Sequence, residues 1–152
     1  MSISSSVCPS GDEKVVLFGL MLETNARLTK ELGAALESSC QLPLAWFGVL
    51  LELRQSADGR LKMSQMADAI VHSTGGTTRL IDRLEAARLV RREHCPNDRR
   101  SIFVAITDEG NAKLDEALGV HLDYLNDHLG ARLDSAEREQ LTGLLSKLNV
   151  AR

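Results

Sequence analysis

The sequence is short of aromatic residues, prolines and cysteines, and each shortage excludes something. One tryptophan, one tyrosine and three phenylalanines among 152 residues leave the core mainly to leucine, valine, isoleucine and alanine. Three prolines, at positions 9, 43 and 96, permit long uninterrupted helices. Three cysteines, Cys8, Cys40 and Cys95, are too few and too widely spaced for a disulfide framework or a CxxC metal site. The length and the hydrophobic content of 43% fit one compact unit with appended arms.

The chain also lacks a long hydrophobic run. Its most apolar stretch begins at Val15 and is interrupted by Glu23, well short of the roughly 20 residues that span a bilayer. The N-terminus, MSISSSVCPSGDEK, has no basic region followed by an apolar one, as a secretion signal would. We therefore expect a cytoplasmic protein with no membrane partner and a flexible polar head over residues 1–11.

Signatures of catalysis and of metal binding are missing as well. The sequence contains no HExxH, no P-loop and no nucleophile elbow. His121 and His128 are seven residues apart on one expected helix, about 10.5 Å along its axis, which is too far to share one ion within that helix. We expect no enzyme, no cofactor and no metal site.

The net charge is small, but positive and negative residues are unevenly distributed along the chain. The formal net charge is −3, which by itself argues against a nucleic-acid partner. Residues 54–107 nevertheless hold 10 basic and 6 acidic side chains, whereas the segments on either side are acidic. A positive middle of this kind is the usual electrostatic footprint of a protein that binds phosphate backbone.

Hydrophobic periodicity predicts a mainly α-helical fold with a small β-hairpin. Two long leucine-striped segments, 12–42 and 108–152, enclose a shorter mixed segment, 43–107. Within the middle segment we expect helices over 42–56, 64–71 and 73–84, with Ser64 as the N-cap of the second, and then strands over 89–95 and 101–107 joined by a turn. Beyond it we expect helices over 108–129 and 134–150, with Asp134 and Glu137 as a capping box at the start of the last.

The short helix followed by the helix from Ser73 has the layout of a helix-turn-helix. In such motifs the second helix enters the major groove and its N-terminal residues contact base edges. Gly75 and Gly76 would let the backbone approach DNA closely, at a cost of about 1 kcal/mol each in a helix interior. The predicted DNA contacts of this helix are Ser73, Thr74, Gly75, Gly76, Thr77, Thr78, Arg79 and Arg83. A nucleotide-phosphate loop and a loose helix start without a partner are alternative interpretations of the glycine pair.

The predicted hairpin extends the same interface. Its turn, PNDRR, places Asp98, Arg99 and Arg100 at the tip, where an arginine can enter the narrow, electronegative minor groove. Asp98 could pair with an arginine and hold it in position. We expect Arg100 to enter the minor groove, and Arg99, Arg91 and Arg92 to contact phosphates. An ordinary solvated turn is the alternative.

At these residues the sequence resembles the MarR (multiple antibiotic resistance regulator) family of transcription factors. The wing pattern D-x-R-x-x-x-V-x-[LI]-T-x-x-G is matched from Asp98 to Gly110, and "QMADAI" with "TTRLIDRLEAARLVRR" fits the family's helix-turn-helix. The resemblance implies a winged helix-turn-helix lobe over 43–107, with 12–42 and 108–152 as dimerisation helices. It further implies a homodimer on a pseudo-palindromic operator, most often as a repressor. The sequence departs from the family at Arg88, where glycine is common and would favour a left-handed helix end.

Regulators of this family are often released from DNA by a small aromatic or anionic effector. Trp46 is a candidate wall of such a pocket, although an ordinary core position is the alternative. Cys95, beside the wing, is the candidate for a redox-sensing regulator of the same fold. A winged-helix adaptor that binds proteins and no DNA is a further alternative, and it would be expected to lack the basic residues found here.

Overall fold

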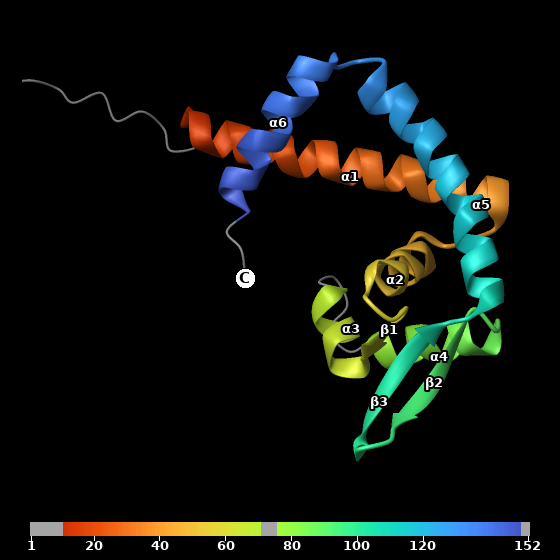
Figure 1. Cartoon of the computed structure of the whole chain (residues 1–152). Helices are drawn as coiled ribbons and strands as arrows, with labels where there is room; N and C mark the ends of the chain where they lie inside the picture. Colours follow the sequence, from red (N-terminus) through yellow and green to blue (C-terminus); the bar gives the residue numbers. More distant parts are fainter. Residues whose placement is uncertain (1–10, 71–75, 150–152) are drawn as a thin grey trace, which may run out of the picture.

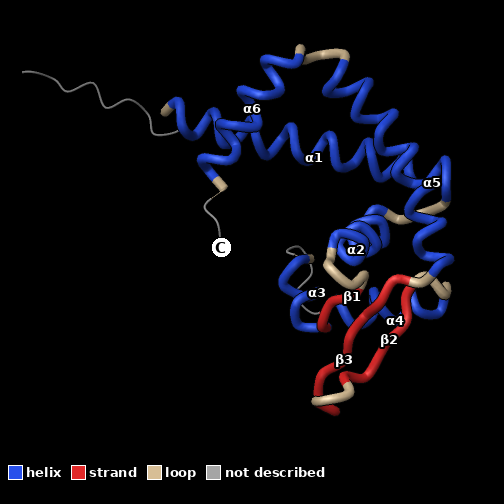
Figure 2. The backbone as a smooth tube through the Cα atoms, viewed as in Figure 1, coloured by secondary structure: helices blue, strands red, loops and turns tan. Residues whose placement is uncertain are grey.

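The chain folds into a group of long helices at one end and a smaller lobe of helices and strands at the other (Figure 1). The computed structural model describes residues 11–70 and 76–149. The elements are α1 (Glu13–Cys40), α2 (Leu44–Gln55), β1 (Arg60–Lys62), α3 (Met63–Ala69), α4 (Thr77–Ala86), β2 (Val90–Cys95), β3 (Asp98–Ile106), α5 (Asp108–Leu125) and α6 (Ser135–Leu148). The strands all lie in the lobe, away from α1 and α6 (Figure 2). The predicted fold class, mainly helical with a small β wing, is confirmed.

Helix α1 begins and ends where its side chains and backbone permit. The Asp12 side chain accepts a hydrogen bond from the Lys14 backbone N–H at 2.8 Å, which satisfies one free amide of the first turn. At the other end Gln41 adopts a left-handed φ of 54°, and its N–H donates to the Glu37 carbonyl. Pro43 then precedes α2, and the two helices meet at an angle of 88°. This bend separates the long helix α1 from the lobe.

The lobe contains a three-stranded antiparallel sheet in the order β1-β3-β2. Strand β1 was not predicted, because three residues after an Asp-Gly turn give no periodic signal. It pairs with β3 in the register Arg60 opposite Ala105 and Lys62 opposite Phe103. The expected N-cap at Ser64 is wrong, because α3 already begins at Met63. There the Gln65 side chain accepts a hydrogen bond from the Lys62 backbone N–H at 2.9 Å.

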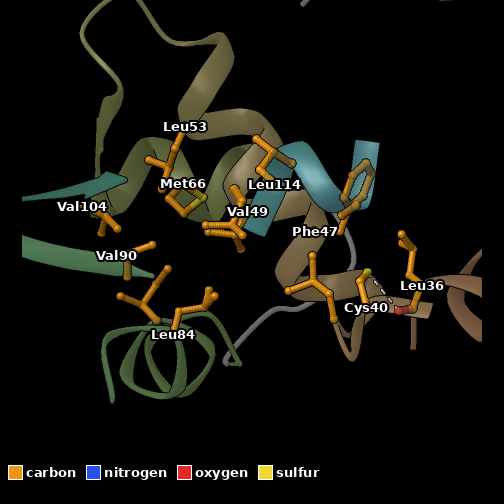
Figure 3. Packing of buried hydrophobic residues seen from close by; sticks show 14 residues of the cluster. Leu36, Cys40, Phe47, Val49, Leu53, Met66, Leu84, Val90, Val104 and Leu114 are labelled. Atoms are coloured by element: carbon orange, nitrogen blue, oxygen red, sulfur yellow. Dashed lines mark hydrogen bonds between the residues drawn. The ribbon is translucent and has the colours of Figure 1, made fainter. Parts of the chain in front are cut away.

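One aliphatic core joins the lobe to the long helices (Figure 3). Its fully buried side chains come from α1, α2, α3, α4, the sheet and α5: Leu36, Val49, Leu50, Leu53, Met66, Ile81, Leu84, Val90, Val104 and Leu114. Aromatic residues contribute little to it, as the composition predicts. Because α2 packs between α5 and the sheet, this core fixes the position of the lobe relative to α5.

Helix α4 ends in a left-handed turn at Arg88. The Arg88 N–H donates to the Glu85 carbonyl at 2.9 Å and the Leu89 N–H to the Leu84 carbonyl at 3.0 Å, the paired bonds of a Schellman motif. Arg88 has a φ of 63°, the conformation that glycine adopts without strain. Arginine at the position where the resemblance leads us to expect glycine therefore does not prevent the left-handed helix end, but it puts a residue with a Cβ in an unfavourable backbone conformation.

The start of α5 is fastened to that same turn. The Thr107 hydroxyl donates to the Arg88 carbonyl at 2.6 Å and accepts from the Gly110 N–H at 3.0 Å, so it also caps α5. A Cβ on Gly110 would lie 2.1 Å from the Leu89 carbonyl oxygen, so only glycine fits there. The threonine and the glycine of the wing pattern, Thr107 and Gly110, thus connect the wing to the following helix.

The predicted helix over 108–129 is interrupted near its end. Helix α5 stops at Leu125 and a single π-helical turn, Asn126–Gly130, follows. Beside it the Tyr124 hydroxyl donates to the Leu28 carbonyl of α1 at 3.0 Å, and the rings of Tyr124 and His128 stack at 4.0 Å. The predicted capping box of α6 is confirmed, since Asp134 and Glu137 exchange two hydrogen bonds.

Helices α1 and α6 leave much apolar surface uncovered. Exposed large hydrophobic side chains include Val15, Val16, Leu17, Phe18, Leu20 and Leu22 of α1 and Leu141, Leu144, Leu145 and Leu148 of α6. In Figure 1, α6 crosses α1 at the end of the molecule opposite the wing. Many exposed large apolar side chains on two neighbouring helices are typical of an interaction surface.

Candidate nucleic-acid interface

Helix α4 has one buried face and one exposed basic face. Thr77, Ile81 and Leu84 are buried against the core, whereas Arg79 and Arg83 are exposed. Thr77, which we expected to contact bases, is only 7% exposed and faces inward with the helix core positions. Thr78 is exposed, as the prediction requires.

The helix begins later than the sequence predicts. Its first residue is Thr77 rather than Ser73, so α4 has ten residues and a length of about 15 Å. Gly76 is the N-cap, with φ −94° and ψ −12°, a position that glycine fills well and that carries no interior penalty. The predicted contacts Ser73, Thr74 and Gly75 lie outside the described residues.

The wing tip differs from the predicted five-residue turn. Only Pro96 and Asn97 lie between the strands, so Asp98, Arg99 and Arg100 belong to β3. Cys95 is paired with Asp98 and His94 with Ile102, which leaves residues 99–101 without partners across the ladder. This is a bulge, a feature that turns side chains out of the sheet.

Asp98 shapes the bulge and holds no guanidinium group. One of its carboxylate oxygens accepts from the Arg100 backbone N–H at 3.0 Å, and the other accepts from the Ser101 hydroxyl at 2.8 Å. The hydrogen bond from the Arg100 backbone, followed by that from Ser101, lowers the pKa of Asp98. The expected ion pair between Asp98 and an arginine is therefore wrong, and the carboxylate instead fixes the backbone that carries Arg99 and Arg100.

Four of the predicted DNA-contacting arginines form no ion pair within the described ranges: Arg79, Arg83, Arg99 and Arg100. All four are exposed, and α4 and the wing lie at the end of the lobe remote from α6 (Figure 1). The two other predicted phosphate contacts are engaged within the chain. Arg91 pairs with Glu93 at 2.8 Å, and Arg92 pairs with Asp82 at 2.7 Å and with Glu85.

The outer face of the sheet carries one basic residue, Arg60, that sequence reasoning missed. Arg60 pairs with Glu93 at 3.3 Å, and its guanidinium carbon lies 4.9 Å from the centre of the Phe103 ring. A hollow of about 430 Å³ lies beside it, lined in part by Asp58, Arg60 and Arg91. The unpredicted strand β1 brings Arg60 there, so only recognition of that strand could have revealed the cluster.

Arg54, also missed, ties the lobe to α5. Its guanidinium donates to the Asn111 side chain at 2.7 Å and to the Asn111 carbonyl at 2.9 Å, and it pairs with Asp115 at 3.0 Å. Asp115 is an exposed residue of α5. Its partner lies 61 positions earlier in the chain, and no local pattern identifies a contact at that separation.

The other candidate residues are Trp46, for an effector pocket, and Cys95, for redox sensing. Trp46 is partly buried against the core, and the described hollows are lined by other residues. Cys95 is half-buried in β2 and unbonded. Among the described residues no group of three or more His, Cys, Asp or Glu could hold a metal ion. No single described helix is long and apolar enough to cross a membrane, although α1 and α2 pass that test as a bent pair.

Comparisons with known proteins agree with this geometry. A sequence profile described as the MarR family matches residues 41–101, the lobe through the wing bulge. The transcriptional repressor MdtR of Bacillus subtilis is 34% identical over 60% of this chain, which spans 57% of MdtR. The crystal structure of AbsC, a MarR family regulator of Streptomyces coelicolor, is 30% identical and superposes with a TM-score of 0.79 over 91% of this chain and 90% of AbsC.

A second Streptomyces coelicolor regulator of the family, Sco3205, was solved in complex with DNA. It is 26% identical to this chain and superposes with a TM-score of 0.80, covering 90% of this chain and 86% of Sco3205. The fold of this chain thus recurs in a solved member of the family over nine-tenths of its length. The protein belongs to the MarR family of transcriptional regulators.

Proposed function

We propose that this protein is a homodimeric, sequence-specific DNA-binding regulator that acts as a repressor in the cytoplasm. The observation that carries the proposal is the set of four exposed, unpaired arginines on α4 and on the wing bulge. Arginines held without an intramolecular partner are available for phosphate oxygens and base edges. A related protein, Sco3205, was crystallised in complex with DNA, which supports DNA binding by the corresponding lobe of this chain.

The roles divide between the helix and the wing. Arg79 and Arg83 on α4 and Arg99 on β3 contact phosphates, and Arg100 enters the minor groove. Base edges are contacted by Thr78, together with Ser73 and Thr74. Gly75 and Gly76 permit close approach of the backbone. Asp98 contributes by fixing the bulge, and Thr77 by packing.

A second copy of the chain covers the apolar surfaces of α1 and α6. Leu144, for example, is 51% exposed and Phe18 is 61% exposed in the single chain. A symmetric dimer would place two copies of α4 on successive major grooves of a pseudo-palindromic operator.

Repression is relieved by a small aromatic or anionic effector. MdtR, which is 34% identical over 60% of this chain, is named a repressor, and this supports the direction of regulation. Trp46 lies at the edge of the core near the junction of α2 with the long helices. An effector bound beside it would act on the contact between the dimer helices and the lobe.

The decisive experiment measures affinity for the DNA upstream of the protein's own gene over a salt series. Wild-type binding should weaken steeply as salt rises, because each phosphate contact contributes a slope of about −0.9. Arg83→Gln removes one phosphate contact per protomer, so for the dimer the salt dependence should become less steep by about 1.8. The matched control, Lys30→Gln on α1, removes the same charge outside the interface and should keep the wild-type slope. Affinity that is independent of salt would refute the proposal.

A further inference from the structure

Arg92 lies on β2 beside the recognition helix, and its surroundings differ from those of the free arginines. Its guanidinium donates to Asp82 at 2.7 Å and to Glu85 at 2.5 Å, both on α4. Its backbone N–H donates to the other oxygen of Glu85 at 3.1 Å. The Arg92 side chain is 24% exposed, against 57% for Asp82. Burial opposes its charge, but the bonds to Asp82 and Glu85 raise the pKa of Arg92 overall.

The two carboxylates that Arg92 binds would otherwise weaken a DNA-binding surface. Helix α4 carries Arg79 and Arg83 as its basic residues and Asp82 and Glu85 as its acidic ones, so its side chains sum to zero charge. Asp82 follows Arg79 by three residues, and side chains at that spacing on a helix are neighbours that can pair. In the structure Asp82 binds Arg92, and Arg79 has no ion pair among the described residues.

The position of Arg92 in the strand explains why it can do this. Arg92 is paired with Val104, a fully buried residue, so its side chain projects to the α4 side of the sheet. Arg91, one residue earlier, is paired with Ala105 and projects to the opposite side, where it binds Glu93. Two adjacent arginines of equal charge are thus assigned to different faces by the strand alternation.

We propose that Arg92 is a positioning residue for DNA recognition, which holds Asp82 and Glu85 away from the DNA face of α4 and so keeps Arg79 available for phosphate. This inference rests on the proposed DNA binding and replaces the expectation that Arg92 touches phosphate itself. Arg92 acts through the two carboxylates, so its effect depends on their presence.

The test is a set of four variants, each measured for operator affinity over the same salt series. Arg92→Gln should weaken binding on the order of tenfold, because two unmasked carboxylates then face the phosphates and Asp82 competes for Arg79. Lys30→Gln, a control that removes one positive charge on α1, should change affinity by about twofold or less. The triple variant Arg92→Gln with Asp82→Asn and Glu85→Gln should return affinity and salt slope to those of the wild type. The pair Asp82→Asn with Glu85→Gln should bind at least as tightly as the wild type.

Other results would overturn the inference in distinguishable ways. If Arg92 contacts phosphate directly, the triple variant stays weak and its salt slope is lower by about 1.8 than that of the wild type. If the ion pairs of Arg92 serve only to hold β2 against α4, the double variant Asp82→Asn with Glu85→Gln binds as weakly as Arg92→Gln. If Arg92→Gln binds like the wild type, Arg92 does not keep Asp82 and Glu85 away from the DNA. Should Arg92→Gln fail to fold, by its thermal midpoint, the triple variant against the wild type still decides. A wild type that shows no salt-dependent operator binding refutes the proposed function instead.

Discussion

At the scale of single residues, two residues with a Cβ adopt the left-handed backbone conformation that such residues normally avoid. Gln41 and Arg88 both have left-handed φ values, 54° and 63°, at positions that end a helix. A left-handed conformation costs a residue with a Cβ roughly 1–2 kcal/mol. The two hydrogen bonds that close α4 are formed nonetheless, and the chain passes from this turn directly into β2.

This strain gives a prediction at Arg88. Arg88→Gly should raise the free energy of unfolding by about 1 kcal/mol, because glycine adopts the left-handed conformation without a steric cost. Urea unfolding at one fixed protomer concentration measures it, since a dimer's stability depends on concentration.

A matched variant separates backbone strain from charge. Arg88→Ala removes the same guanidinium group but keeps the Cβ, so it should give little or none of that gain. Equal stabilisation by both variants would show that the charge of Arg88, and not its backbone conformation, is unfavourable.

At the scale of elements, the local signals predicted that each helix exists but not where α3 and α4 begin, and they missed one strand of the sheet and the bulge of another. Asp134 and Glu137 form the predicted capping box because both partners lie within four residues of each other. Strand β1 and the bulge at 99–101 depend on pairing with residues far along the chain. Their existence could not be predicted from a three-residue segment or from a turn-like composition.

The contact between α2 and α5 gives a prediction about pH. His121 of α5 meets the Phe47 ring edge-on at 5.1 Å, and burial lowers the pKa of His121 below its ordinary value. The unfolded chain therefore binds a proton more readily than the folded one, so stability is lost as pH falls through the ordinary histidine pKa of about 6.5.

Replacing His121 should remove that part of the pH dependence. Urea unfolding of the wild type and of His121→Leu, each at about pH 7.5 and 5.5, measures the difference. The wild type should lose more stability on acidification than His121→Leu does. Equal losses in the two proteins would show that the remaining titrating groups account for the whole effect.

At the scale of the whole molecule, the single chain exposes apolar side chains at one end, on α1 and α6. The lobe has a complete core, whereas α1 and α6 expose leucines and a phenylalanine on their surfaces. Leu145 is 45% exposed and lines a hollow with Met21 of α1. A second copy that packs on these helices would remove this surface from water, and in the proposed dimer the spacing of the two lobes depends on that packing.

This places a prediction on α6. Leu145→Glu should shift the protein from dimer to monomer and weaken operator binding, because a charge at a buried interface must be desolvated without a partner. Sedimentation equilibrium and operator titration measure the two effects. Gln140→Glu, which adds the same charge at an exposed polar position of α6, is the control and should remain dimeric. A Leu145→Glu protein that stays a dimer would exclude this face from the interface.

The sequence by itself determined the helical fold class, the order of the helices and the hairpin, the wing pattern and the basic middle segment, because periodicity, capping and charge are local properties. Only the tertiary structure decided which arginines are free. Arg79, Arg83, Arg91 and Arg92 look alike in the sequence, yet strand alternation and the packing of α4 against β2 pair the last two with carboxylates and leave the first two unpaired. An ion pair depends on which side chains meet across elements, and that follows from the path of the chain rather than from any one segment of it.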